Sequence, residues 1–159
     1  MDRVLARFIF LFFVGVITIS PASFASGAQL YISSLQGKPG QSINIPLMLD
    51  EVDNLAGVKI VMKYDTGILT FIKGTRTKQT SSLMHIINDK KPGLLIVVMA
   101  GAKGVKGKKF PILNLTFAIK KDLKGSHSTS LEITEAQLMS DKLKDISCDI
   151  KVGPLVIKN

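Results

Sequence analysis

Hydrophobic and polar residues alternate along most of the chain after residue 28, and residues 57–69 show this pattern most clearly. One set of side chains comprises Val58, Ile60, Met62 and Tyr64, and the set between them comprises Lys59, Val61 and Lys63. Strict alternation is typical of a β-strand that buries one face and exposes the other. The first set is predicted to point inward. The outward set carries no group suited to catalysis, so this strand favours a binding surface over an active site.

The same alternation predicts eight or nine strands, and no segment shows helical periodicity. The predicted strands are Gln29–Ser34, Ser42–Asp50, Ala56–Tyr64, Ile68–Lys73, Leu83–Asn88, Leu94–Ala100, Phe110–Lys120, Thr129–Met139 and Ile146–Ile157. A change of phase within Thr129–Met139 predicts a bulge. Pro46 cannot donate a hydrogen bond to a sheet, so it predicts an edge or a bulge there. Short alternating strands joined by turns indicate an all-β fold, a flattened antiparallel β-sandwich.

Polar segments between the strands are predicted to be loops, and two of them carry clustered charges. Gly101–Lys109 holds four lysines and three glycines and is predicted to be a mobile basic connection. Its glycines lack the spacing of a phosphate-binding loop, and Lys109 is followed by Phe110 instead of Ser or Thr. Asp50, Glu51 and Asp53 cluster in the second loop, where they are either solvated or ligands of a calcium ion.

The N-terminus has the order of a secretory signal peptide: a basic start, the apolar run of twelve residues Phe8–Ile19, and then small residues. Residues 1–25 are therefore predicted to be cleaved, which gives a secreted or periplasmic protein. An uncleaved membrane anchor is the alternative. A bilayer span needs about 20 apolar residues, so no stable membrane span is expected.

The chain is basic, with a formal charge of +9. Residues 1–25 hold two arginines and one aspartate, so their removal leaves +8. Such a charge suits an acidic partner, an anionic polysaccharide or a membrane surface, unless the lysines are simply solvated. Nucleic acid is not expected, because the sequence shows no recognition-helix pattern and few aromatic residues.

The residues that carry chemistry in other proteins are sparse here. His85 and His127 have no Cys, Asp or Glu partner at a spacing that suits a metal. No nucleophile motif is present, so the sequence predicts no catalytic residue, no metal, no cofactor and no enzyme activity. Cys148 lies in the alternating run Ile146–Val152 and is predicted to be a buried, inert thiol.

The order of these segments resembles the cohesin domain, the β-sandwich module that binds dockerin domains in cellulosome-type assemblies. The likeness rests on the strand SINIPLML, the stretch AGVKIVMKYD followed by Leu69, and the later segments ILNLTFAIK, LEITEAQL and VGPLVI. It implies one domain over residues 29–158, with the nine-stranded jelly roll that cohesins share with some carbohydrate-binding modules. It also implies a partner-binding face on Ala56–Tyr64, Leu83–Asn88 and Leu94–Ala100. The partner-binding residues would be Lys59, Val61, Lys63, Asn88 and Asp89.

The chain departs from the cellulosomal pattern in its charge. Lys59 stands where cellulosomal cohesins often carry an acidic or small polar residue, and Gly101, Ala102 and Lys103 replace acidic residues. We therefore expect a dockerin-like or other protein partner with an acidic face. The alternative is a polysaccharide-binding module linked to polysaccharide catabolism. The chain has no Trp, and its two tyrosines are Tyr31 and Tyr64, which argues against a site that stacks sugars on aromatic rings.

Overall fold

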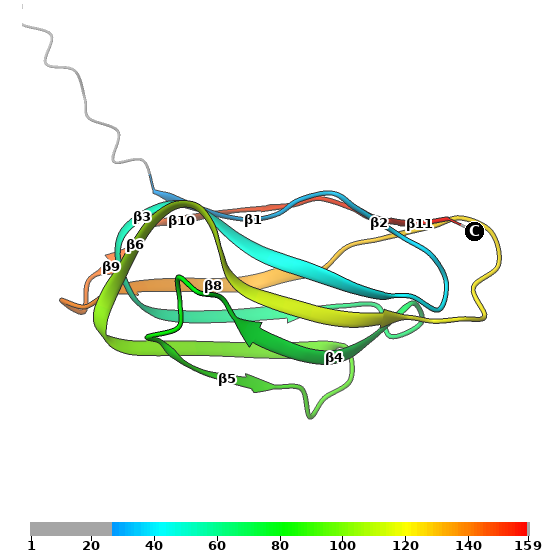
Figure 1. Ribbon diagram of the computed structural model, residues 1–159, viewed down its shortest axis with the longest axis horizontal. Helices are drawn as coiled ribbons and strands as arrows, with labels where there is room; N and C mark the ends of the chain where they lie inside the picture. Colours follow the sequence, from blue (N-terminus) through cyan, green and yellow to red (C-terminus); the bar gives the residue numbers. More distant parts are fainter. Residues whose placement is uncertain (1–26, 159) are drawn as a thin grey trace, which may run out of the picture.

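The computed structural model describes residues 27–158 of the chain (Figure 1). The predicted signal peptide or anchor lies outside these residues. The strands are β1 (Ala28–Ile32), β2 (Leu35–Gly37), β3 (Ser42–Lys63), β4 (Leu69–Arg76), β5 (Met84–Asn88), β6 (Leu94–Ile119), β7 (His127–Thr129), β8 (Glu132–Ser140), β9 (Asp145–Ile146), β10 (Cys148–Val152) and β11 (Leu155–Ile157). Residues 27–158 contain no helix long and apolar enough to cross a membrane. The prediction of an all-β sandwich is confirmed.

Two long strands, β3 and β6, connect the layers of the sandwich because each contributes one half to each layer. The first half of β3 pairs with the second half of β6, and this layer has the order β10–β1–β3–β6–β4. The other halves pair again, and β8 and β5 flank them in the second layer. A small sheet of order β2–β11–β7 closes one end. Figure 1 shows β3 and β6 bending together at the opposite end.

The loop predictions for Gly101–Lys109 and for the Asp50–Asp53 cluster are wrong, because both segments belong to this bend. Gly101–Lys109 lies within β6, and Asp50–Asp53 lies within β3. The two strands pair through the bend at Glu51 with Lys108 and at Val52 with Gly107. Pairing satisfies backbone groups that a loop would leave to water. The glycines and lysines hid this strand from sequence reasoning because both residue types are depleted in strands.

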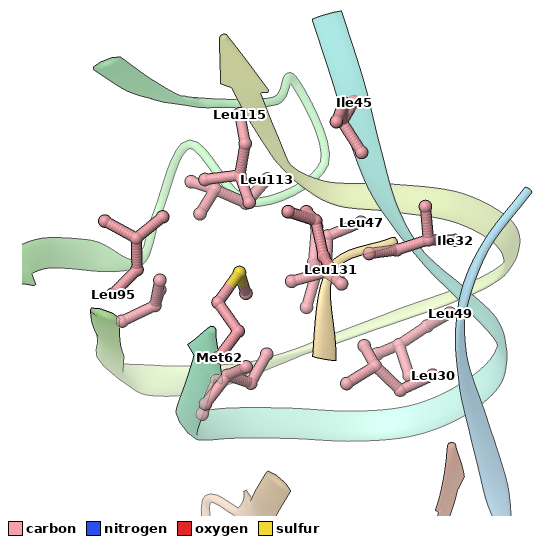
Figure 2. Packing of buried hydrophobic residues seen from close by; sticks show 14 of the residues in the cluster. Leu30, Ile32, Ile45, Leu47, Leu49, Met62, Leu95, Leu113, Leu115 and Leu131 are labelled. Atoms are coloured by element: carbon pink, nitrogen blue, oxygen red, sulfur yellow. The ribbon is translucent and has the colours of Figure 1, made fainter. Parts of the chain in front are cut away.

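The core lies between the two layers and consists of the inward sets that the alternation predicts. Val58, Ile60 and Met62 are buried from one layer, and Leu113 and Leu115 are buried from the other. Figure 2 shows Met62 and Leu95 pointing toward the side chains of Leu47, Leu113 and Leu131. Tyr64 is half-buried and packs edge-on against Phe117, with the ring centroids 5.2 Å apart. Its predicted inward direction is confirmed.

Both predicted irregularities are present. The register of β8 against β3 shifts between Val61 and Met62, so Thr134 forms the bulge that the change of phase predicts. The register of β3 against β6 shifts next to Pro46, between Leu47 and Met48. Strand β1 pairs with β3 only at Met48 and Leu49, so Pro46 lies where β3 has β6 alone as a neighbour. This edge position tolerates the missing N–H donor of Pro46, and the residue left unpaired at the register shift is Ile112 on β6.

The last strands are less buried than the alternation predicts. Cys148 is half-buried instead of fully buried, although it packs against the core. Ile150 is 43% exposed. Strand β10 pairs in parallel with β1 and forms an edge of its layer, where one side of each side chain remains open to solvent.

Candidate binding face

The outward side of the second layer forms a continuous surface, which we call the sheet face. It comprises β5, the half of β6 at Leu94–Ala100, the half of β3 at Gly57–Lys63, and β8. Cross-strand pairing arranges its side chains in rows. The rows are Met84–Ala100–Gly57–Met139, Ile86–Val98–Lys59–Gln137 and Asn88–Ile96–Val61–Glu135. This layout follows from the alternation, because residues two apart on a strand share a face.

The β5 side of the sheet face is apolar and exposed. Met84 is 72% exposed, Ile86 68% and Val98 41%. Met139, at the far end of the first row, is 38% exposed. Between Met84 and Met139 the row holds only Ala100 and Gly57, so small residues separate two long side chains. Exposed apolar side chains that gather on one surface often mark an interaction site.

The β3 side of the sheet face carries paired charges. The Lys59 Nζ lies 2.7 Å from the Glu135 Oε1, and the Lys63 Nζ lies 4.0 Å from the Glu132 Oε2. The two lysines predicted to meet an acidic partner therefore have acidic neighbours on β8. Sequence reasoning missed these pairs because a strand pairing across 76 positions cannot be read from local spacing.

The other predicted contact residues also lie at this surface. Val61 is half-buried in the third row, beside Ile96 and opposite Glu135. Asn88 ends β5 on the same face, and its Oδ1 accepts a hydrogen bond of 3.1 Å from the Lys90 backbone N–H. Asp89 is exposed in the hairpin just beyond. The structure thus brings Lys59, Val61, Lys63 and Asn88 onto one face.

Sequence reasoning missed the apolar half of this face. The predicted contacts came from β3 and from the end of β5, so Met84, Ile86 and Val98 were left out. A signal was present, because the outward set of β5 begins with the two large apolar residues Met84 and Ile86. One set, with Ile87, packs toward the core, and the other, with Met84 and Ile86, faces outward. Large apolar residues on the outward side of an edge strand indicate a surface that another molecule can cover.

The acidic residues at the bend are engaged within the chain. The Asp50 Oδ1 accepts hydrogen bonds of 2.6 Å from the backbone N–H groups of Gln29 and Glu51. Glu51 pairs with Lys108 at 2.8 Å. Asp50, Glu51, Asp53 and Asn54 line a cavity of about 620 Å³ at this end. Over residues 27–158, no group of three or more His, Cys, Asp or Glu side chains is placed to hold a metal ion.

The two histidines lie on different strands, β5 and β7. His85 is half-buried on the inward side of β5. His127 lies in β7, with its Nε2 3.0 Å from the Lys124 carbonyl oxygen.

The fold of this chain is similar to that of solved cohesin structures. A cohesin from scaffoldin B of Acetivibrio cellulolyticus, solved with a dockerin, has a TM-score of 0.73 at 20% identity, covering 84% of this chain and 99% of that one. A non-cellulosomal cohesin from Archaeoglobus fulgidus has a TM-score of 0.74 at 13% identity, covering 84% and 93%. A type I cohesin of Clostridium thermocellum, in a complex named Coh-OlpC-Doc435, has a TM-score of 0.72 at 18% identity, covering 82% and 93%.

The sequence is also similar to known proteins. A gellan lyase from a Bacillus species is 23% identical over 137 residues, which is 77% of this chain. This chain spans only 6% of that protein's length. The family model described as "Cohesin domain" matches residues 28–154, nearly all of the described structure. The chain therefore belongs to the cohesin domain family.

Proposed function

We propose that this chain is a secreted, non-catalytic binding module that holds a protein partner on its sheet face. The observation that carries the proposal is the apolar group Met84, Ile86 and Val98, exposed side by side on β5 and β6. Burial of apolar area contributes about 25 cal/mol for each Å² removed from water. A partner that covers these side chains gains that stabilisation.

The partner that suits this surface is a dockerin-like protein with an apolar contact region. Several of the similar cohesin structures are named as complexes with dockerins, which supports this class of partner. The sequence alone predicts an acidic partner. Because Glu135 and Glu132 lie beside Lys59 and Lys63, we propose instead that apolar contacts dominate and that the charged pairs border them. Charged residues at such a border contribute more to orientation and association rate than to affinity.

The test is calorimetric titration of the full chain with each dockerin domain encoded in the source genome. Ile86→Asp places a charge in the centre of the apolar group. We expect it to weaken binding at least about tenfold, as substitutions in the centre of an interface do. Ile72→Asp is the matched control, because Ile72 is 49% exposed on β4, in the other layer. It should change affinity less than about twofold.

Two results would contradict the proposal. If no dockerin domain binds the wild-type chain, the partner is not dockerin-like. If one binds and Ile72→Asp weakens it as much as Ile86→Asp, the sheet face is not the contact surface. Circular dichroism of both variants separates loss of binding from loss of folding.

The predicted alternative is a role in binding polysaccharide. The name of the similar Bacillus protein, gellan lyase, supports it. Stacking of sugars on aromatic rings receives no support at the sheet face, because its rows contain no aromatic residue. A sugar bound at the sheet face would therefore have to be held by polar contacts.

A further inference from the structure

A second surface of the molecule is basic, and it lies away from the sheet face. Five exposed lysines gather at the end closed by β2, β7 and β11, and we call this surface the lysine end. Its members are Lys38, Lys120, Lys121, Lys124 and Lys158. In Figure 1 this end, marked by β2, β11 and the C-terminus, lies opposite the bend of β3 and β6.

Backbone hydrogen bonds hold the three segments of the lysine end together. The Lys158 N–H donates to the Gly37 carbonyl at 3.1 Å, which brings the C-terminal segment beside Lys38. The Gly40 N–H donates to the Ile119 carbonyl at 3.1 Å, and the Ile119 N–H donates to the Gln41 carbonyl at 2.8 Å. Gly40 has a φ of 79°, and a Cβ there would lie 3.2 Å from the Lys121 Cγ. Lys38, Lys120, Lys121 and Lys158 therefore lie in or next to hydrogen-bonded segments.

The five lysines of the lysine end outnumber the acids beside them. Asp122 is the one acidic residue in its three segments, residues 37–41, 119–128 and 157–158, and Asp65 lies in the neighbouring turn, whose Ile68 carbonyl accepts a hydrogen bond from the Lys120 N–H. The salt bridges found among residues 27–158 involve Lys59, Lys63 and Lys108, and none involves a member of the lysine end. The bend at the other end differs, because Glu51 and Asp53 accompany its lysines and Lys108 is paired. The lysine end thus carries a concentrated field that attracts anions.

We propose that the lysine end binds a carboxylate-bearing polysaccharide. Ammonium groups on several turns suit a chain of carboxylates, and the exposed hydroxyls of Ser126 and Ser128 can hydrogen-bond sugar hydroxyls. Membrane docking fits less well, because stable attachment to a membrane requires apolar side chains that insert into it as well as positive charge. The exposed large apolar residues found within residues 27–158 all lie outside the three segments. Single-stranded nucleic acid also fits less well, because it is held by stacking on aromatic rings, and these segments contain none.

The test uses the full chain and polygalacturonate, with dextran as the neutral polysaccharide, in calorimetry at low and high salt. We expect binding to polygalacturonate that weakens with salt, and none to dextran. The variant Lys120→Gln/Lys121→Gln/Lys124→Gln should weaken it at least about tenfold, a loss of about 1.4 kcal/mol. The control Lys103→Gln/Lys106→Gln/Lys142→Gln removes the same charge from the opposite end and should cost less than about twofold.

The experiment has clear contrary outcomes. Equal weakening by the two triple variants would show that net charge alone binds the polymer, and it would overturn the proposal. Absence of binding to polygalacturonate would do the same. Tighter binding to phosphatidylglycerol vesicles or to duplex DNA at the same salt concentration would reassign the surface to those ligands. The proposal does not rest on the sheet face, and Ile86→Asp should leave polygalacturonate binding unchanged.

Discussion

Lys59 on β3 and Glu135 on β8 form an ion pair, with the Lys59 Nζ 2.7 Å from the Glu135 Oε1. Glu135 lies opposite Val61 in the register, next to the bulge at Thr134, so its side chain reaches diagonally to Lys59. The sheet face therefore presents balanced charges on β3 and β8 and apolar side chains on β5 and β6. A partner must therefore cover the half formed by β5 and β6 to bury apolar area.

The Lys59–Glu135 pair should contribute little to folding stability. Both side chains are partly exposed, at 45% and 38%, so solvent screens their attraction. A double-mutant cycle with Lys59→Ala and Glu135→Ala should give a coupling of about 0.2–1 kcal/mol, and less at high salt. Urea unfolding measures it. The Lys63–Glu132 pair, at 4.0 Å, is the control and should show weaker coupling. A coupling above about 2 kcal/mol would mean that the pair is much better shielded than its exposure indicates.

Phe117 should be the most sensitive position in the core. It is fully buried on β6 and meets two rings edge-on, Tyr64 at 5.2 Å and Phe71 at 5.5 Å. Phe117→Ala should destabilise the fold by about 3–5 kcal/mol. Phe117→Leu keeps most of the volume and should cost less than half of that. Urea or thermal unfolding followed by circular dichroism compares them. Equal costs for the two variants would show that loss of the ring contacts, and not the cavity, sets the penalty.

Alternation made the half-buried strands predictable. Val58, Ile60 and Met62 occupy the core as expected, because a strand with one apolar face has a single register that buries it. The same reasoning placed the bulge in β8 from the change of phase between Ile133 and Ala136. Four of the five predicted contact residues lie on the sheet face, since cross-strand neighbours of one alternating set share a face.

The bend and the apolar half of the sheet face could not be predicted in the same way. Gly104 and Gly107 suggested a loop, yet in the structure they lie where backbone and side chains approach closely. A Cβ on Gly107 would come within 2.7 Å of the Phe110 ring, so the glycine there is required by packing. Ile86 and Val98 lie opposite each other in the hairpin of β5 and β6. The residue pattern within each strand does not determine this register.

Thr80 should be required for the loop between β4 and β5. It is fully buried, and its Oγ1 donates a hydrogen bond of 2.8 Å to the Ile112 carbonyl. The same oxygen accepts from the Thr77 N–H at 3.1 Å, while the Thr77 Oγ1 donates to the Pro111 carbonyl at 2.7 Å. The carbonyls of Pro111 and Ile112 lie where the register of β3 and β6 shifts, so the two threonines satisfy groups that the shift leaves open.

Replacing Thr80 by Val keeps the shape and removes these hydrogen bonds. Two buried backbone groups then lose a partner, and we expect a loss of about 1–3 kcal/mol in the free energy of unfolding. Thr80→Ser keeps the hydroxyl and should cost less. Urea unfolding gives the free energies, and hydrogen exchange at residues 77–83 shows whether the loop opens locally. A neutral Thr80→Val would mean that water replaces the hydroxyl.

Cys148 should react slowly with alkylating agents while the chain is folded. Burial raises the pKa of the Cys148 thiol above its ordinary value, and Asp149 and Asp50 act in the same direction, opposed by a backbone hydrogen bond at Leu30. The thiolate is the reactive form, so iodoacetamide should label the folded protein more slowly than the urea-unfolded protein at pH 8–9. The pH midpoint of the labelling rate should also be higher for the folded chain.

The same raised pKa makes folding stability depend on pH. The folded state holds the thiol proton more tightly than the unfolded state. The stabilisation is therefore complete below the unfolded pKa and is lost as pH rises through the folded pKa. The difference in unfolding free energy between wild type and Cys148→Ser isolates this effect, because other groups titrate equally in both. We expect wild type to lose stability relative to Cys148→Ser across the alkaline range. If the folded thiol titrates at or below the pH at which the unfolded thiol titrates, the prediction is wrong. Cys148 would then be an activated thiol and not an inert one.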